Sequence, residues 1–120
     1  MENKKLIEDY INGWLKNNEI QILEILDDSR IIIESHGTKY VGKEKCKKWI
    51  KEWLTNNKVI KWEIISFYEL KQTAFFEWKF ECTGEGKKHF LEGISIVRFE
   101  DNKIKYLREY RTTKPISIYD

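Results

Sequence analysis

Few side chains of this sequence have both the type and the spacing that chemistry requires. His36 and His89 are the two histidines, and histidine is the side chain that ordinarily titrates near neutral pH. A zinc site needs three or four converging ligands, which two separated histidines do not supply, so we expect no metal and no other cofactor. Cys46 and Cys82 have neither a paired spacing nor a secretory context, and we expect both to be small buried hydrophobes.

The charge pattern argues against a nucleic-acid partner. The chain has 22 Lys and Arg residues interleaved with 20 Asp and Glu residues, which gives a formal net charge of +2. Nucleic-acid binders usually concentrate positive charge on one face, because their affinity comes from neutralising phosphates. The lysine cluster in residues 43–51 alternates with apolar residues at helical spacing, so we interpret it as the solvated face of a helix.

Length and hydropathy indicate one small globular domain. The chain has 120 residues, of which 41% are hydrophobic and 35% charged, and we expect a single domain over residues 1–120. No apolar run approaches the ~18–20 residues that a membrane helix needs, and the start of the chain is amphipathic, unlike a signal peptide. The sequence therefore predicts a soluble, cytoplasmic protein with no membrane partner.

The first half of the chain has a helical apolar period. Steps of three and four residues between apolar positions predict helices over residues 6–15, 20–26 and 43–54. We expect the turn-forming residues 27–29 to end the second helix. A β-branched run then predicts a strand over 30–35, followed by a loop over 37–42 that is bracketed by two glycines.

In the second half the apolar period is two, which is typical of strands. Short turn-competent connections separate the strands, so successive strands are predicted to pair as antiparallel hairpins. A short tail follows from Pro115. The four predicted strands span 59–70, 73–83, 88–100 and 103–112.

Apolar residues occupy both faces of the last two predicted strands. Three helices can cover only one face of a sheet, so the second apolar face needs another cover. A partner subunit related by a two-fold axis is the simplest cover, and we expect a homodimer through the outer sheet face. The residues assigned to that outer face are Phe90, Ile94, Ile96, Tyr106 and Tyr110.

The order of elements resembles the nuclear transport factor 2-like superfamily, in particular its SnoaL-like branch. The motifs that carry the resemblance are residues 37–42 before the Trp49 and Trp53 helix, and segments 76–80, 90–96 and 103–110. The resemblance covers essentially the whole chain. It implies an α+β fold, a curved antiparallel sheet with three helices on its concave face, shaped as a cone with a ligand cavity at the wide end. Because the superfamily holds isomerases, cyclases, dehydratases and hydrolases, these motifs specify the fold better than the activity.

The resemblance also implies which residues line the cavity. The steroid isomerase pattern, laid on the final two strands, places Ser95 where those enzymes have an acidic oxyanion-hole donor. Ile11 is nearest to the position of their second donor, a tyrosine, with Tyr10 and Trp14 adjacent. Because a serine hydroxyl also cannot act as a neutral acid of tuned pKa, we do not expect steroid isomerisation here. The same pattern places further strand residues on the cavity face, with His89 toward one end, and these are Phe76, Trp78, Phe80, Leu91, Gly93, Leu107, Glu109 and Arg111.

SnoaL-type cyclases use a carboxylate on the last strand with a histidine nearby, and Glu109 is the closest match. In an apolar cavity, desolvation would raise the pKa of this carboxyl toward the range of a general base. His36 and Glu34 are the candidates to assist it by relaying a proton. The alternatives are a salt bridge of Glu109 with Arg108 or Arg111, and an exposed surface pair of Glu34 with His36.

Five tryptophans are a heavy aromatic load for a chain of this size. Trp14, Trp53 and Trp78 come from two long helices and a central strand, so in a cone they would converge on one cavity and stack a flat ligand. We expect Trp49 and Trp62 to be core residues.

Three functions are consistent with these patterns. The leading hypothesis is a domain that binds a small apolar organic ligand in a tryptophan-lined pocket and performs isomerase- or cyclase-type acid/base catalysis on a cyclic carbonyl compound. The second is the same pocket used for binding alone. The third is a protein-interaction module whose cone is filled by side chains. The sequence does not separate an enzyme from a binding protein.

Overall fold

The structure is a computed structural model in which residues 3–119 are described. Three helices come from the first half of the chain, as predicted: α1 (Asn3–Leu15), α2 (Glu19–Ile25) and α3 (Lys43–Asn56). Asn18 separates the first two, because its side-chain oxygen accepts a hydrogen bond from the backbone N–H of Gln21 (3.1 Å) and caps α2.

One six-stranded sheet accounts for the rest of the fold. Its strands are β1 (Leu26–Ile33), β2 (Lys39–Val41), β3 (Asn57–Leu70), β4 (Thr73–Gly84), β5 (Lys87–Glu100) and β6 (Lys103–Arg111). Their spatial order is β2-β1-β6-β5-β4-β3. The meander from β3 to β6 is antiparallel, which confirms the predicted hairpins. β1 lies parallel to β6, so the sheet as a whole is mixed.

Two predictions about the segment between the helices were wrong. The expected loop over 37–42 contains the short strand β2, which pairs with β1. Residues 27–29, expected to end the second helix as a turn, belong to β1, where the pairing register shifts between Leu26 and Ile31. The turn chemistry is present, because the Asp27 carboxylate accepts hydrogen bonds from the N–H (2.8 Å) and the hydroxyl (2.7 Å) of Ser29.

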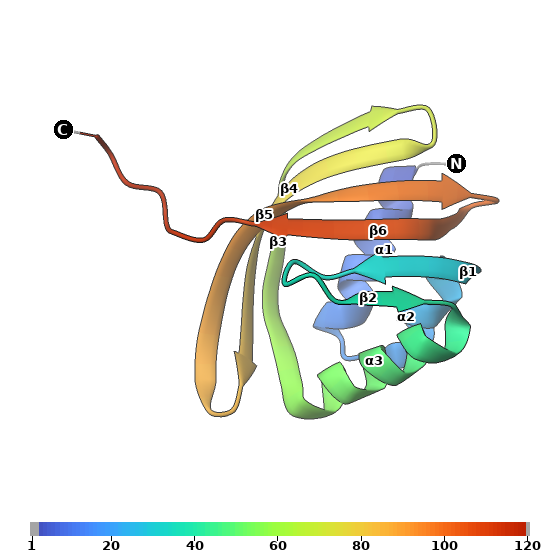
Figure 1. Cartoon of the computed structure of the whole chain (residues 1–120), viewed down its shortest axis with the longest axis horizontal. Helices are drawn as coiled ribbons and strands as arrows, with labels where there is room; N and C mark the ends of the chain where they lie inside the picture. Colours follow the sequence, from blue (N-terminus) through green and yellow to red (C-terminus); the bar gives the residue numbers. More distant parts are fainter. Residues whose placement is uncertain (1–2, 120) are drawn as a thin grey trace.

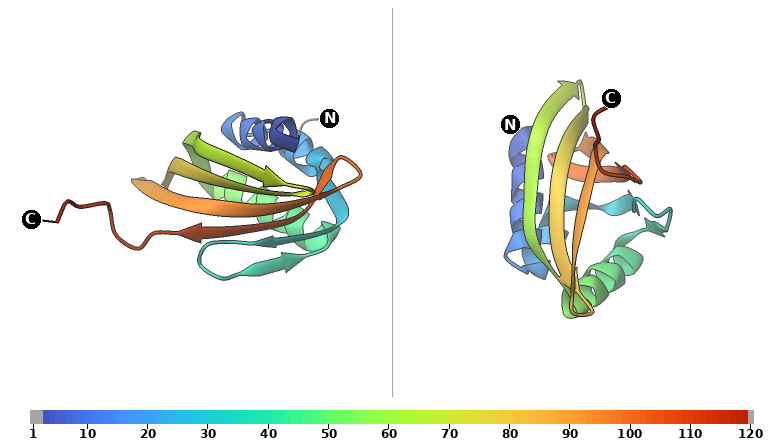
Figure 2. Two further views of the ribbon diagram at one scale, coloured as in Figure 1. Left: turned by 90° about the horizontal axis from the view of Figure 1, so that it is seen from above. Right: turned by 90° about the vertical axis from the view of Figure 1, so that its left-hand side faces the viewer.

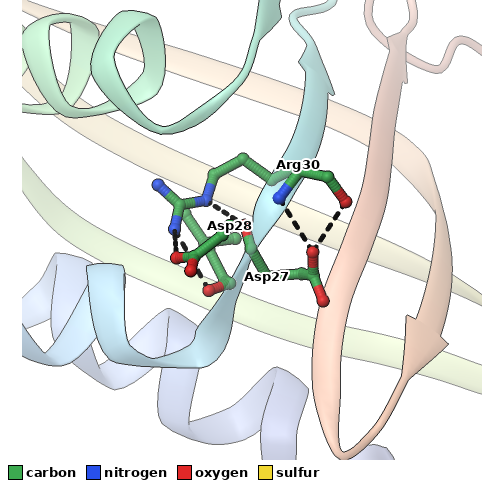
Figure 3. A network of polar contacts seen from close by, with 5 residues as sticks. Asp27, Asp28 and Arg30 are labelled. Carbon is green, nitrogen blue, oxygen red and sulfur yellow. Dashed lines mark hydrogen bonds and ion pairs between the residues drawn. The ribbon is translucent and has the colours of Figure 1, made fainter.

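A buried arginine holds this irregular start of β1. Arg30 is 1% exposed, and its guanidinium turns back along the chain, donating hydrogen bonds to the carbonyl oxygens of Asp27 and Leu26 (Figure 3). The carboxylate of Asp28 lies 3.7 Å away, but its side chain is 84% exposed. The two carbonyl oxygens are therefore the main partners of Arg30.

The helices lie on the concave side of the sheet, which bends around them. Figure 1 shows α1 behind the long strands and α3 along the lower rim, and the end-on view in Figure 2 shows α1 beside β3. The core fills the space between the two layers, whereas residues 113–119 extend away from the body of the fold. The sheet does not close into a barrel, because β2 and β3 are free edges. Within residues 3–119, no helix has the length and apolar character needed to cross a membrane.

Candidate functional site

A cavity of about 450 Å³ lies between the helices and the concave sheet face. All five tryptophans of the chain line it. Three further aromatic residues, Tyr10, Tyr40 and Phe80, complete its aromatic wall. Pockets of this size that bind small molecules are usually apolar with a few polar groups. This cavity combines the aromatic wall with a larger polar share, because charged and polar residues such as Glu34, Glu52 and Glu109 also line it.

The periods of the elements bring these rings together. Tyr10 and Trp14 are four residues apart on α1, and so are Trp49 and Trp53 on α3, so each helix presents two rings on one face. On β4 the alternation of side chains places Trp78, Phe80 and Cys82 on the concave face.

Most neighbouring rings meet edge to face. Ring centroids lie 5.3 Å apart for Trp14 and Trp53, with an interplanar angle of 87°, and 5.4 Å apart for Trp62 and Phe80, with an angle of 88°. Tyr40 and Trp49 are stacked instead, at 4.8 Å. Offset and T-shaped contacts are the favoured arrangements of aromatic pairs, so the rings stabilise one another in the wall of the cavity.

Trp78 is anchored by two contacts within the sheet. Its indole N–H donates a buried hydrogen bond to the Ser95 hydroxyl at 2.8 Å. On the neighbouring strand, a Cβ added to Gly93 would lie 2.8 Å from the Trp78 ring and still closer to the carbonyl oxygen of Tyr110. Gly93 therefore allows the ring to pack directly on β5.

Glu109 on β6 is a half-buried carboxyl in the lining of this aromatic cavity. Burial, together with the negative charge of Glu34, raises its pKa from 4.5 to about 8. Within residues 3–119 it forms no salt bridge, and Arg108 instead lies over the ring of Tyr110, 4.6 Å from its centroid. A carboxyl with such a pKa can exchange protons near neutral pH.

Tyr10 is the hydroxyl-bearing residue of α1 that shares the cavity with Glu109. Its side chain is 1% exposed. Burial raises its pKa well above 10, and the charge of Glu109 raises it further, so the phenol stays protonated. A protonated phenol beside a carboxyl can donate a hydrogen bond to a ligand oxygen.

Glu34 and His36 lie at the end of β1 and form a connected polar group at the cavity wall. Glu34 accepts hydrogen bonds from the Tyr40 hydroxyl (2.7 Å) and pairs with the His36 Nε2 (3.0 Å). The Glu34 side chain is 14% exposed and that of His36 is 54% exposed. The pair thus extends from the cavity wall to solvent.

The structure places the predicted site residues in two groups. Those in the cavity lining are Glu34, His36, Glu109, Trp14, Trp53, Trp78, Leu91 and Arg111. Phe76, Ser95 and Leu107 are fully buried in the core beside the cavity, and Ser95 reaches the site only through its hydrogen bond to Trp78.

Other residues of the lining were not among the predicted site residues. Trp49 and Trp62 were expected to be core residues only; both pack against the core and also line the cavity. Tyr10, Tyr40 and Glu52 line it as well. The four-residue spacing of Tyr10 from Trp14, and of Trp49 from Trp53, was the signal that could have identified two of them.

Several indole groups of the wall have no partner. The Nε1 atoms of Trp14, Trp49 and Trp62 are buried without a hydrogen-bond acceptor in the described part of the chain. Unpaired buried donors are uncommon in folded proteins.

Among residues 3–119, no three Cys, His, Asp or Glu side chains come together as possible metal ligands.

Comparison with protein families gives one match over most of the chain. Residues 7–107 match the model of the SnoaL-like domain. No curated protein matches the chain.

Solved structures with very different sequences share the fold. A hypothetical protein from Catenulispora acidiphila DSM 44928, with a ketosteroid isomerase-like fold and in complex with trimethylamine, superposes with a TM-score of 0.82 at 12% identity, covering 93% of this chain and 88% of that one. An LEH-like epoxide hydrolase from M. tuberculosis has a TM-score of 0.82 at 10% identity, covering 90% and 80%.

A third structure is a SnoaL-like polyketide cyclase candidate from Shewanella denitrificans OS-217. Its TM-score is 0.80 at 11% identity, covering 91% of this chain and 89% of that one. Identities this low show a common fold and do not transfer an activity.

Proposed function

The chain belongs to the SnoaL-like domain family, and from this premise we propose that it binds a small organic molecule in its tryptophan-lined cavity and acts on it by acid/base catalysis. The observation that carries the proposal is Glu109, a carboxyl whose pKa of about 8 suits proton transfer and which lies in an aromatic cavity. The proposed substrate is a cyclic carbonyl compound that stacks on the indole rings.

In the proposed reaction, Glu109 removes a proton from the carbon next to the carbonyl group. The electron pair of that C–H bond moves toward the carbonyl oxygen and forms an enolate, which the Tyr10 hydroxyl stabilises by donating a hydrogen bond. The protonated Glu109 then returns the proton to another carbon, as in an isomerisation, or passes it on before a ring-closing step. Glu34 and His36 relay protons between the cavity and solvent.

Two observations favour a ligand site over a protein-interaction module with a filled cone. The cavity has a volume of about 450 Å³, which is ample for a small molecule. The Catenulispora structure of the same fold is in complex with a small molecule, trimethylamine. A binding protein without turnover would use the same cavity, and a mutation of Glu109 separates these two functions.

We also propose that the single domain forms a homodimer through its outer sheet face, where Phe90, Ile94 and Tyr110 are exposed. This arrangement would cover apolar side chains that the helices do not reach. The cytoplasmic location stays a prediction from the sequence.

The binding part of the proposal is tested by titrating flat cyclic carbonyl compounds, both polyketide-like and steroid-like, while following tryptophan fluorescence. We expect saturable quenching, which Trp78→Phe weakens because that ring lines the cavity. Ser95→Ala is the matched control, since it removes the hydrogen bond to Trp78 without changing a lining side chain. The absence of quenching across a diverse set of compounds would favour the interaction module.

The catalytic part is tested with Glu109→Gln on a compound that binds and is turned over. General acid/base catalysis typically contributes about 100-fold or more, so kcat should fall by at least about that factor while the affinity stays within a few-fold. An unchanged kcat would remove Glu109 from the mechanism and leave a different catalytic group or a binding protein.

A further inference from the structure

We propose that the cavity selects ligands that carry a positively charged, alkylated amino group, such as a tertiary or quaternary ammonium. This inference deepens the proposed small-molecule function and rests on it, because it names the chemical class of the ligand. It is argued from the aromatic rings and the carboxylates that face the same cavity.

The aromatic wall is the first argument. Eight aromatic side chains surround one cavity, and five of them are tryptophans. The π face of an indole attracts a cation more strongly than that of tyrosine or phenylalanine, and boxes of several aromatic rings are the usual site for alkylated ammonium groups. The positive charge of such a cation is distributed over its methyl groups. These groups form an apolar surface that packs against an aromatic wall.

The ring geometry supports the same class of ligand. Trp14 contacts the rings of both Trp49 (5.4 Å) and Trp53 (5.3 Å), and Trp62 lies nearly perpendicular to Trp78, at 82°. Rings at large mutual angles can present faces and edges to a compact ammonium group from several sides, while a flat part of the same ligand stacks on a single indole face.

The distribution of charge is the second argument. The lining contains the carboxyls of Glu34, Glu52 and Glu109, but only one of the chain's 22 basic residues, Arg111. The charged side chains of α3 are divided in the same way. All five lysines of this helix lie outside the cavity lining, whereas Glu52 lies within it. Carboxyl groups thus outnumber basic side chains in the lining by three to one, and Glu109 adds its negative charge only as it ionises, at about pH 8.

The titration of Glu109 adds a consequence that can be measured. The charged and titratable groups in the same cavity are Tyr10 from α1, Tyr40 from β2, Glu52 from α3, Cys82 from β4, His89 from β5 and Arg111 from β6, together with Glu34 and His36 just after β1. A bound cation stabilises the ionised form of Glu109, whose pKa is about 8 without a ligand. Affinity for the cation should therefore rise with pH as this carboxyl loses its proton, and binding should release a proton.

The test compares two ligands of the same shape and different charge, choline and 3,3-dimethyl-1-butanol, in which carbon replaces the ammonium nitrogen. The full-length protein is titrated with each while tryptophan fluorescence is followed, because all five indoles line the cavity. We expect choline to bind at least about tenfold more tightly than its neutral analogue, since cation–π attraction acts on choline alone.

Two variants assign the preference to the cavity. Glu34→Gln should weaken choline binding by about fivefold and leave the neutral analogue unchanged, because it removes a charge and keeps an oxygen that can accept from Tyr40. Glu44→Gln, on α3 outside the cavity lining, should change neither. An effect of Glu34→Gln on both ligands equally would mean that this residue acts through packing, and would contradict the charge argument.

The possible outcomes separate this inference from the proposed function. Equal or tighter binding of 3,3-dimethyl-1-butanol would overturn the cation preference and leave a small-molecule pocket in place. Saturable binding of neutral carbonyl compounds without any binding of choline would also overturn the cation preference and leave the small-molecule pocket in place. Loss of the proposed function would appear instead as the absence of quenching by every compound tested.

Discussion

The Glu109 carboxyl lies in the cavity and forms no ion pair with any cation of residues 3–119. Such a group is more stable neutral than charged, because the aromatic wall cannot replace the water that solvates a carboxylate. The fold therefore gives up stability to hold this group, which is common where a residue serves a function. The effect can be measured as a dependence of stability on pH, without any substrate.

The unfolding free energy should fall as pH rises between the two pKa values of Glu109. The carboxyl ionises near 4.5 in the unfolded chain and at about 8 in the fold, so across this range the folded state alone holds the proton. The contribution is fully present below about pH 4.5 and is lost at up to about 1.4 kcal/mol per pH unit above it. Glu109→Gln cannot ionise, so the variant should become increasingly more stable than the wild type from about pH 5 to about pH 8.

Urea unfolding of the wild type and of Glu109→Gln at several pH values measures this difference in unfolding free energy. Other groups that titrate equally in the two proteins contribute equally to both and drop out of the difference. Glu44→Gln provides the control, because Glu44 is exposed on α3 and should give a difference that does not vary with pH. A constant difference between Glu109→Gln and the wild type would show that Glu109 has an ordinary pKa.

At the scale of elements, the junction of α2 with β1 depends on Arg30. Removing its side chain leaves the carbonyl oxygens of Leu26 and Asp27 without their donor and opens a buried space. We expect Arg30→Ala to lower the free energy of unfolding by about 3 kcal/mol. Asp28→Ala should change it by less than about 0.5 kcal/mol, since exposed ion pairs contribute little. Both variants are measured by chemical unfolding. An equal loss of unfolding free energy in Arg30→Ala and Asp28→Ala would mean that the ion pair with Asp28, and not the two carbonyl oxygens, stabilises Arg30.

The sequence predicted the elements whose residues repeat with a clear period. The three helices and the four long strands are confirmed to within a few residues at their ends. The start of β1 was missed because Asp27 and Ser29 have the side chains of a turn and form one locally, while the backbone around them stays extended. β2 was missed because three residues between two glycines carry no detectable period.

The candidate site was predictable by face but not by position along the strands. Phe76, Ser95 and Leu107 lie on the concave face, as the alternation indicated, yet they sit further along the strands than the cavity does. Trp62 was expected in the core and packs against it, but its place in the cavity lining was not predicted. The register of β3 shifts on both sides of it, between Val59 and Lys61 and between Ile64 and Ser66, so simple alternation does not give its face.

On the scale of the whole molecule, no helix of residues 3–119 covers the outer face of the sheet. All three helices lie on the concave side, and Phe90 (70% exposed) and Ile94 (38% exposed) face outward from β5. Arginines cover part of this surface, because Arg98 lies over the ring of Tyr106 and Arg108 over that of Tyr110. The remaining apolar side chains lie around Ile94, which pairs across the strands with Tyr110 and Glu77.

If two copies associate through this face, a charge at its centre should separate them. We expect the wild-type protein to sediment at twice the mass of the chain, and Ile94→Asp to sediment as a folded monomer, because a buried unpaired carboxylate strongly opposes association. Ile20→Asp is the matched control: Ile20 is 71% exposed on α2, on the other side of the sheet, and its substitution should leave the dimer intact. Analytical ultracentrifugation at micromolar concentrations, with circular dichroism to verify folding, measures all three proteins. A wild-type monomer, or an Ile94→Asp dimer, would place the interface elsewhere or exclude it.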